Sequence, residues 1–179
     1  MDLEQFRELL QKSAPNQDQL SSIGLSKKEV QEFLRSFQLV KRDAIFKPSS
    51  GGIVEHFFTT YDPAKIEIGM VTFLSGPATK LNYVIIGKVE SDPLVIDKSS
   101  GLVSVVDLAS PSTVLWSCAD SFSQFLDALI PAADFLGKCI ISDDTRDNCA
   151  LLESVIEKCT SLAGGPSYDS FYRMLIGSE

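Results

Sequence analysis

The sequence predicts an α+β fold, a single domain in which a central, mostly antiparallel sheet is packed by N-terminal and C-terminal helices. Three observations predict it. Amphipathic helical patterns occupy residues 1–40 and 120–177, at the two ends of the chain. Residues 44–118 between them hold short β-branched segments separated by turn-forming residues, which is typical of a meander. A length of 179 residues suits one domain with a substantial core.

Two amphipathic helices are expected before the sheet. The first covers residues 2–11, with Asp2 as its cap and apolar residues at helical spacing. A polar linker follows at Ser13–Asp18. The second covers Lys27–Gln38, because Ser26–Glu29 has the capping-box pattern and an apolar stripe follows it. These apolar stripes suit packing in the core or a groove for a partner helix, and both interpretations stay open.

The pattern between Ala44 and Gly76 is weaker. Composition alone predicts a loop, a strand, a turn and a second strand there, at Ser49–Gly52, His56–Thr60, Tyr61–Pro63 and Met70–Leu74. Periodicity does not separate a buried strand from a buried helix in such short apolar runs. The order of strands at this edge of the sheet is therefore left open.

The central meander is better defined. One strand runs over Asn82–Gly87, a hairpin joins Leu94–Ile96 to Leu102–Val106, and a further strand runs over Thr113–Trp116. The hairpin loop, Asp97–Gly101, offers a glycine that can take the left-handed conformation and an aspartate that can accept bonds from loop amides.

The C-terminal part returns to helical spacing. Ser121–Gln124 has the capping-box pattern, and Pro131 is expected to lie beyond the end of that helix. Leu136–Ile141 is a short apolar run of uncertain type. Asp143–Asp147 is an acidic helix start, suited to the positive end of the helix dipole, and its apolar stripe continues to a Gly-Gly pair. Pro166 begins the last helix.

Charge is distributed unevenly along the chain. Residues 1–60 hold eight Lys/Arg and eight Asp/Glu, whereas residues 61–179 hold eight and sixteen, so the net charge of −8 belongs to the second part. Nucleic acid is a poor partner for such a surface, because its binding requires cations that neutralise phosphates. A basic protein would be attracted instead, and solubility alone is the other explanation of the acidity.

Three further features limit the kinds of site and the cellular location that we expect: the four cysteines, the single histidine and the N-terminus. The cysteines contain no C-x-x-C spacing, and Cys149 and Cys159 lie about 15 Å apart along one predicted helix, too far to bridge. Reduced, mostly buried thiols are expected, with no metal and no cofactor. No apolar run reaches the length of a membrane span and no signal peptide pattern begins the chain, so we expect a cytoplasmic protein.

Catalytic patterns are scarce. His56 has apolar neighbours that favour a structural role over general-base chemistry, although a small hydrolase using His56 and an aspartate is one hypothesis. Asp92, Asp97 and Asp107 follow or precede strands, where turn stabilisation competes with acid–base pairing. Asp97 and Asp107 are expected at the same edge of the sheet.

Residues 143–147 also resemble the start of a calcium-binding EF-hand loop. The sixth position of such a loop is Asn148 rather than glycine, and the twelfth is Ser154 rather than glutamate. Without the sharp turn and the bidentate ligand, helix capping explains these aspartates better than calcium binding.

Several segments of the meander and the C-terminal helices resemble the SUKH superfamily. The residues that carry the resemblance are Ile86–Gly87, Asp92–Leu94, Ile96–Asp97, Ser100–Gly101, Val103, Asp107, Ser121–Leu126 and Ala163–Tyr172. That superfamily includes bacterial immunity proteins of polymorphic-toxin systems and yeast regulators of cell-wall glucan synthesis. The resemblance implies a non-enzymatic immunity protein that binds and neutralises a cognate toxin, with a nuclease domain as the expected target. A regulatory or scaffold protein is the alternative.

An acidic rim is the predicted binding surface for a basic toxin. Its carboxylates and aromatic anchors are Glu90, Asp92, Asp97, Asp107, Asp120, Asp127, Tyr83 and Trp116. Trp116 also has the apolar neighbours of a core residue, and that interpretation stays open. The oligomeric state is not predicted.

Overall fold

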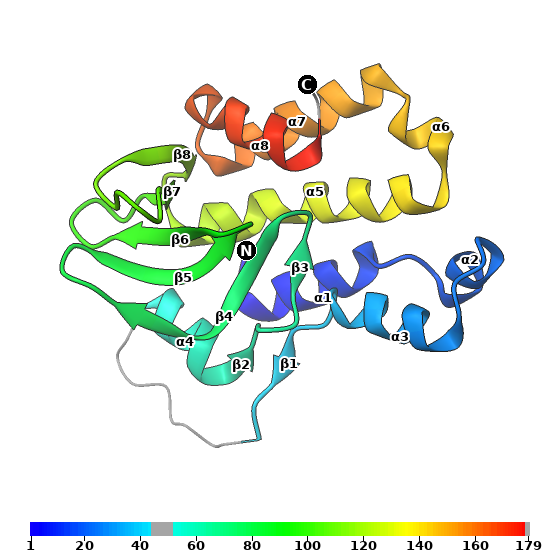
Figure 1. Cartoon of the computed structure of the whole chain (residues 1–179), viewed down its shortest axis with the longest axis horizontal. Helices are drawn as coiled ribbons and strands as arrows, with labels where there is room; N and C mark the ends of the chain where they lie inside the picture. The colour runs from blue at the N-terminus through cyan, green and yellow to red at the C-terminus, as the bar shows by residue number, and fades with distance from the viewer. Residues whose placement is uncertain (44–51, 178–179) are drawn as a thin grey trace.

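The computed structural model describes residues 1–43 and 52–177, and it confirms the α+β fold. Within these residues a six-stranded antiparallel sheet lies beside a long central helix, with helices at both ends of the chain (Figure 1). The helices are α1 (Leu3–Ser13), α2 (Gln17–Ser22), α3 (Lys27–Arg35), α4 (Ile53–Thr60), α5 (Phe122–Ile141), α6 (Asp143–Arg146), α7 (Cys149–Ala163), the 3-10 turn η1 (Pro166–Tyr168) and α8 (Asp169–Ile176).

The main sheet is a meander in which each strand pairs with the next along the chain. Its order is β3-β4-β5-β6-β7-β8, and a separate two-stranded ribbon joins β1 to β2. The strands are β1 (Val40–Lys41), β2 (Tyr61–Asp62), β3 (Glu67–Ile68), β4 (Val71–Thr79), β5 (Tyr83–Val89), β6 (Asp92–Asp97), β7 (Val103–Val106) and β8 (Val114–Ala119). The predicted meander is therefore confirmed, and β4 is longer than expected.

The hairpin between β6 and β7 forms as predicted. Leu94 pairs with Val105 in the register of the two strands, and Gly101 has a φ of 79°. Asp97 Oδ1 accepts hydrogen bonds from the backbone N–H groups of Ser99 and Ser100, at 2.9 and 2.8 Å. One carboxylate thus satisfies the loop amides that would otherwise face outward unpaired.

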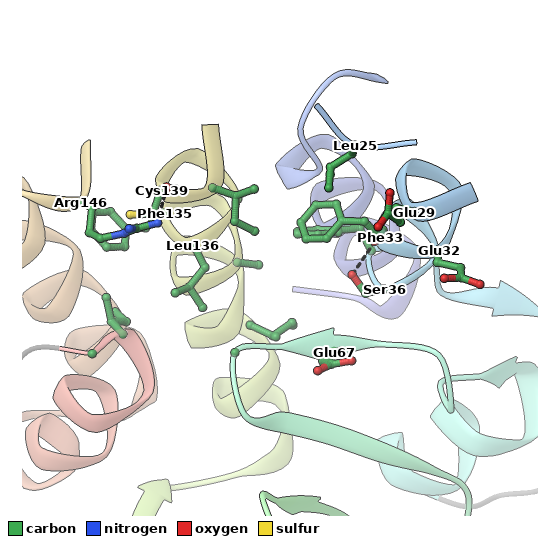
Figure 2. Close-up of a pocket in the computed structure, with 18 of the residues that line it drawn as sticks. Leu25, Glu29, Glu32, Phe33, Ser36, Glu67, Phe135, Leu136, Cys139 and Arg146 are labelled. Atoms are coloured by element: carbon green, nitrogen blue, oxygen red, sulfur yellow. Dashed lines mark hydrogen bonds between the residues drawn. The ribbon is translucent and has the colours of Figure 1, made fainter. Parts of the chain in front are cut away.

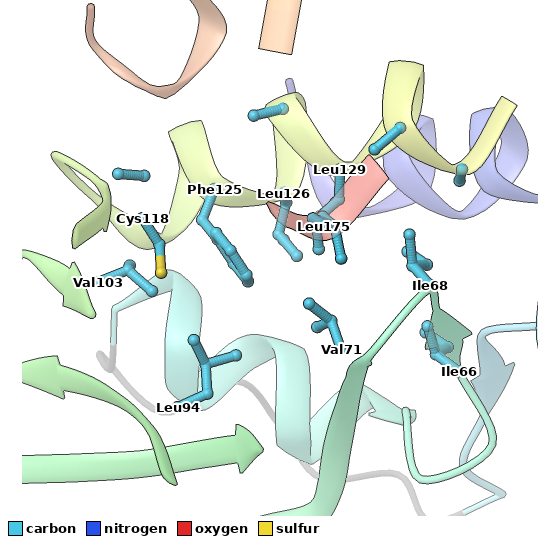
Figure 3. Close-up of a cluster of buried hydrophobic side chains, with 14 of the residues drawn as sticks. Ile66, Ile68, Val71, Leu94, Val103, Cys118, Phe125, Leu126, Leu129 and Leu175 are labelled. Atoms are coloured by element: carbon cyan, nitrogen blue, oxygen red, sulfur yellow. The ribbon is translucent and has the colours of Figure 1, made fainter. Parts of the chain in front are cut away.

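The core lies between the sheet and α5. Figure 3 shows Phe125, Leu126 and Leu129 of α5 facing the side of the sheet that carries Leu94 and Val103. All five side chains are at least 98% buried. Complete burial of a large apolar side chain stabilises a fold by about 1.5–3 kcal/mol, so α5 and the sheet hold each other in place. Figure 1 shows α1 on one side of α5 and α7 with α8 on the other.

The N-terminal helices begin where the sequence predicts. Asp2 and Gln5 form a reciprocal capping box at the start of α1, and Ser26 and Glu29 form one at the start of α3. The linker predicted between the two helices is only partly irregular, because its second part enters the short helix α2, capped by Asn16.

The strand predicted at His56–Thr60 is wrong, because these residues belong to helix α4. Phe57 is fully buried and its ring packs against the rings of Phe73 and Phe122, with centroids 5.5 and 5.2 Å away. Tertiary packing therefore decides the secondary structure of a segment whose periodicity fits either a strand or a helix. The turn predicted at Tyr61–Pro63 is displaced, because its first two residues form β2. Of the predicted loop, residues 49–51 lie outside the described part of the chain.

The expected end of the helix before Pro131 is also wrong, since α5 continues through Pro131 to Ile141. A proline inside a helix removes one backbone hydrogen bond and costs about 3 kcal/mol. Burial compensates here, because Pro131 itself, Ala132, Ala133 and Phe135 are all buried. The run Leu136–Ile141 thus forms the last part of the same helix.

The acidic helix start predicted at Asp143–Asp147 is divided in two. Asp143–Arg146 form only the short α6, and the long helix α7 begins afterwards with Asn148 as its cap. Asn148 Oδ1 accepts from the backbone N–H of Leu151 at 3.0 Å. The amide cap, rather than the aspartates, therefore begins the main helix. Pro166 begins η1, and α8 follows it.

Candidate functional site

The residues of the predicted acidic rim fall into separate places in the fold. Glu90, Asp92 and Asp107 lie at one end of the sheet, around the β5–β6 turn and the end of β7. Asp92 Oδ1 accepts from the backbone N–H of Leu108 at 3.0 Å, and Asp107 Oδ1 accepts from that of Ala109 at 2.7 Å. Both aspartates therefore stabilise the turn that follows β7.

Asp97 and Tyr83 lie at the other end of the sheet, where they pair in register across β5 and β6. Five residue steps along β6 separate Asp97 from Asp92, which is roughly 16 Å in an extended strand. The expectation that Asp97 and Asp107 meet at one edge is thus wrong, because antiparallel strands place them at opposite ends. The Ser99 and Ser100 side chains and the Ser100 N–H donate to Asp97 and lower its pKa to about 2.

The remaining rim residues are held by intramolecular contacts. The Tyr168 hydroxyl donates to Asp120, and the N-terminal ammonium of Met1 forms an ion pair with Asp127 at 3.0 Å. Trp116 is half-buried and packs against the core, as the second interpretation of this residue expects. The eight residues therefore do not form one continuous surface.

A groove lies over the second half of α5. We call it the α5 groove. Its volume is about 800 Å³, within the usual range of ligand sites. It is lined by residues from α3 and its flanks, β3 and the β3–β4 turn, α5, α6, α7 and the end of α8: Leu25, Glu29, Glu32, Phe33, Ser36, Phe37, Glu67, Ile68, Gly69, Ala133, Phe135, Leu136, Gly137, Cys139, Ile140, Arg146, Leu152, Ile176 and Gly177.

The floor of the α5 groove is one face of α5. Ala133, Leu136, Gly137 and Ile140 recur at a spacing of three or four residues, which places them on the same side of a helix. Ala133 is buried, Leu136 is half-buried and Ile140 is 38% exposed. The apolar character of the helix thus continues outward into the groove instead of ending at the core.

Two glycines fix the position of this floor. A Cβ on Gly137 would lie 2.8 Å from the carbonyl oxygen of Ser13, so the end of α1 approaches α5 too closely for a larger residue. Gly69 has a φ of 57°, and a Cβ there would lie 3.2 Å from Leu136 Cδ1. The chain thus packs closely behind and beside the groove, and its shape is set by the fold.

Side chains from three elements face the α5 groove in the close-up. Figure 2 shows Leu25, Phe33 and Glu29 on the α3 side, Leu136 and Cys139 on α5, and Glu67 on the neighbouring strand. Burial raises the pKa of the Cys139 thiol.

Carboxylates border the α3 side. Glu29 caps α3 through Ser26, whose hydrogen bonds lower the pKa of Glu29. Glu32 forms an exposed ion pair with Lys28 at 3.8 Å. Glu67 is exposed and has no ion-pair partner within the described residues. This border therefore carries negative charge that intramolecular contacts engage only in part.

Arg146 is the cation that lines the opposite side. Its Nη2 donates to the carbonyl oxygen of Cys139 at 3.0 Å, and its Nη1 lies 3.5 Å from Asp143 Oδ1. The helix α6 and the residue after it also carry Asp144 and Asp147, but neither lines the groove, so the charge on this side of its lining is that of Arg146.

The α5 groove was not predicted from the sequence as a site. The nearest signal in the sequence is the apolar stripe of α3, for which a partner-helix groove was one of the two open interpretations. That interpretation applies to Phe33, which is half-buried and lines the groove. Val30 and Phe37 of the same stripe are buried. The stripe of α1 instead packs into the core through Leu3, Phe6 and Leu10.

Other candidate residues lie away from the groove. His56 is exposed on α4 and is not among the residues that line the groove. Within the described ranges, 1–43 and 52–177, no three His, Cys, Asp or Glu side chains are grouped so that they could hold a metal ion. In the same part of the chain, no helix has the length and apolar character needed to cross a membrane.

Comparisons with family models, with curated proteins and with solved structures find no match for this chain. The resemblance to the SUKH superfamily therefore stays a prediction from the sequence motifs.

Proposed function

We propose that this protein is a non-enzymatic immunity protein that acts in the cytoplasm, where it binds a cognate toxin and blocks it. A nuclease domain is the proposed target, because the resemblance to SUKH immunity proteins and the acidic surface both suit a toxin with a cationic substrate cleft. The mechanism is occlusion, in which one protein covers the binding surface of the other.

The α5 groove is the observation that carries the proposal. It gathers Ile140 with parts of Phe33 and Leu136 in one concave site, whereas more exposed apolar side chains such as Leu81 and Leu108 do not line it. Exposed apolar side chains rimmed by charge are typical of protein interaction sites. Burial of such a centre contributes affinity, and carboxylates around it contribute attraction to a basic partner.

Association with a basic toxin is expected to depend on salt. The net charge of −8 attracts a cationic surface over a distance of about 8–10 Å at physiological ionic strength. Complementary charge mainly raises the rate of association, whereas the apolar centre slows dissociation.

The test is capture of the partner by the tagged full chain from its native lysate, at low and at high salt, followed by an activity assay. We expect one dominant basic partner that is retained less at high salt. Its nuclease activity should fall to background when the protein is added in equal amount. A dominant partner whose activity is unaffected would contradict the immunity function.

A regulatory scaffold is the second candidate, because the superfamily that the sequence resembles also includes yeast regulators of cell-wall glucan synthesis. Several partners of unrelated charge in the capture experiment, with none inhibited, would favour this function over immunity.

A further inference from the structure

We infer that the α5 groove receives an amphipathic helix of the partner, with an apolar stripe on one face and Lys or Arg along the edge that faces α3. The inference rests on the proposed function in that it assumes a protein partner, and it adds the form and the charge of the segment that binds.

The apolar centre of the groove has the dimensions of a short helical contact. From Ala133 to Ile140 the floor extends seven residue steps, about 10 Å along α5. That length matches two turns of a second helix, which presents apolar residues at positions i, i+3, i+4 and i+7. Phe33 provides an aromatic contact at one side of this stripe.

An extended segment suits the groove less well. The exposed edge of the sheet nearest to it is β3, which is only two residues long. The backbone N–H of Glu67 already donates to the carbonyl oxygen of Ser36 at 3.2 Å. Addition of a strand requires a row of free backbone groups, and this edge does not present one. A helix satisfies its own backbone and needs only side-chain contacts.

Charge selects the edges of the bound helix. Glu29 and Glu32 border one side of the groove, and Glu67 lies at its β3 end. On the other side, the charged residue that lines the groove is Arg146, whose Nη1 lies 3.5 Å from Asp143 Oδ1. The edge of an occupant that faces α3 and β3 would therefore meet carboxylates, which favours Lys or Arg at that edge and disfavours Asp or Glu.

The test uses three fluorescent peptides of about 16 residues, long enough to form a helix on binding. The first has leucines at i, i+3, i+4 and i+7 with lysines along one flank of this apolar stripe. The second has glutamate in place of each lysine, and the third has the composition of the first in scrambled order. We expect the lysine peptide to bind at least about tenfold more tightly than either of the others, as measured by fluorescence anisotropy with the full chain.

Two variants locate the binding. Ile140→Asp places a charge on the floor and should weaken the lysine peptide at least about tenfold. Leu115→Asp is its matched control, since Leu115 is 40% exposed on β8 and Ile140 is 38% exposed in the groove. The control should bind as the unaltered protein does. Circular dichroism and the urea midpoint show whether each variant is folded.

Charge reversal tests the edges. Glu32→Lys should weaken the lysine peptide and strengthen the glutamate peptide, and Glu157→Lys on the outer part of α7 should do neither. Equal binding of all three peptides, or equal loss in the two aspartate variants, would overturn the inference. A concentration-dependent dimer that Ile140→Asp abolishes would overturn it as well, because a second copy would then be the occupant.

Failure of this inference differs from failure of the proposed function. If the unaltered chain captures and inhibits a toxin, and Ile140→Asp does so equally well, the toxin binds elsewhere and the groove inference is wrong. If the lysine peptide binds as expected but no captured partner is inhibited, the groove binds such helices and the immunity function is wrong.

Discussion

The ends of the sheet and the borders of the α5 groove both carry carboxylates, but they use them differently. Asp97 accepts four hydrogen bonds from the two serines of its own loop. Asp92 and Asp107 each accept bonds from turn amides. Glu67, at the groove, has no such bond within the described residues, and Glu32 has only a distant, exposed ion pair. Acidic composition alone therefore does not identify a binding surface.

The difference follows from the local backbone. A tight turn leaves N–H groups pointing outward, and a short Asp side chain reaches them. At the groove only Glu29, in the first turn of α3, reaches a free amide, whereas Glu32 and Glu67 accept no backbone hydrogen bond within the described residues and their charge remains available to a partner. The sheet ends are accordingly interpreted as structural, and the groove borders as the surface that attracts.

The largest expected effect tests whether Asp120, at the end of β8, is structural. Gly164 has a φ of 122°, and a Cβ there would lie 1.9 Å from Asp120 Oδ2. Gly164→Ala should lower the free energy of unfolding by more than the about 1–3 kcal/mol typical of backbone strain. Gly165→Ala is the control, because its φ is 128° and nothing lies within 4 Å of the added Cβ. Urea unfolding of the two variants measures the difference.

Equal destabilisation by the two glycine variants would mean that the contact with Asp120 contributes nothing. Adding Asp120→Ala to Gly164→Ala should recover part of the loss, since it removes the atoms that the new methyl group meets. No recovery would point to backbone strain alone.

An intermediate effect concerns acid stability at the β6–β7 hairpin. The pKa of Asp97 is about 2 in the fold and has an ordinary value of 3.8. A carboxyl group whose pKa is lowered by folding stabilises the fold above its unfolded pKa, and that stabilisation is lost as pH falls from about 4 towards 2. Asp97→Asn should therefore flatten the loss of stability over this range.

The measurement is the urea midpoint of the Asp97→Asn variant and of the unaltered protein at several values between pH 5 and about 2. Glu67→Gln is the matched control from the groove, and it should follow the unaltered protein throughout. Identical curves for Asp97→Asn and the unaltered chain would show that the ionisation of Asp97 does not contribute to acid stability.

Patterns that depend on local chemistry could be predicted from the sequence. The capping boxes of α1 and α3 formed because Asp2 and Ser26 precede residues able to return the hydrogen bond. The β6–β7 hairpin formed because its loop holds an aspartate and a glycine where a tight turn requires them. Each of these signals lies within a few residues.

Features that depend on distant contacts could not be predicted. His56–Thr60 is helical because Phe57 packs among aromatic rings from β4 and α5, which no local pattern encodes. Pro131 ends a helix by local rules, and α5 continues because its second half is buried on several sides. The α5 groove was missed for the same reason, since its floor belongs to the half of α5 beyond Pro131.

The smallest expected effect compares the two sets of carboxylates directly. Paired Glu32→Gln and Glu67→Gln should slow association with the lysine peptide several-fold at low salt, because charge near the groove attracts it. Paired Asp92→Asn and Asp107→Asn remove the same formal charge at a sheet end and should change the rate less. Stopped-flow fluorescence at about 50 mM and about 300 mM salt measures both, and the difference should shrink at the higher concentration. If the paired Asp92→Asn and Asp107→Asn substitutions slow association more, the lysine peptide approaches the turns of β6 and β7. That outcome would favour the predicted acidic rim as the binding surface at that end of the sheet.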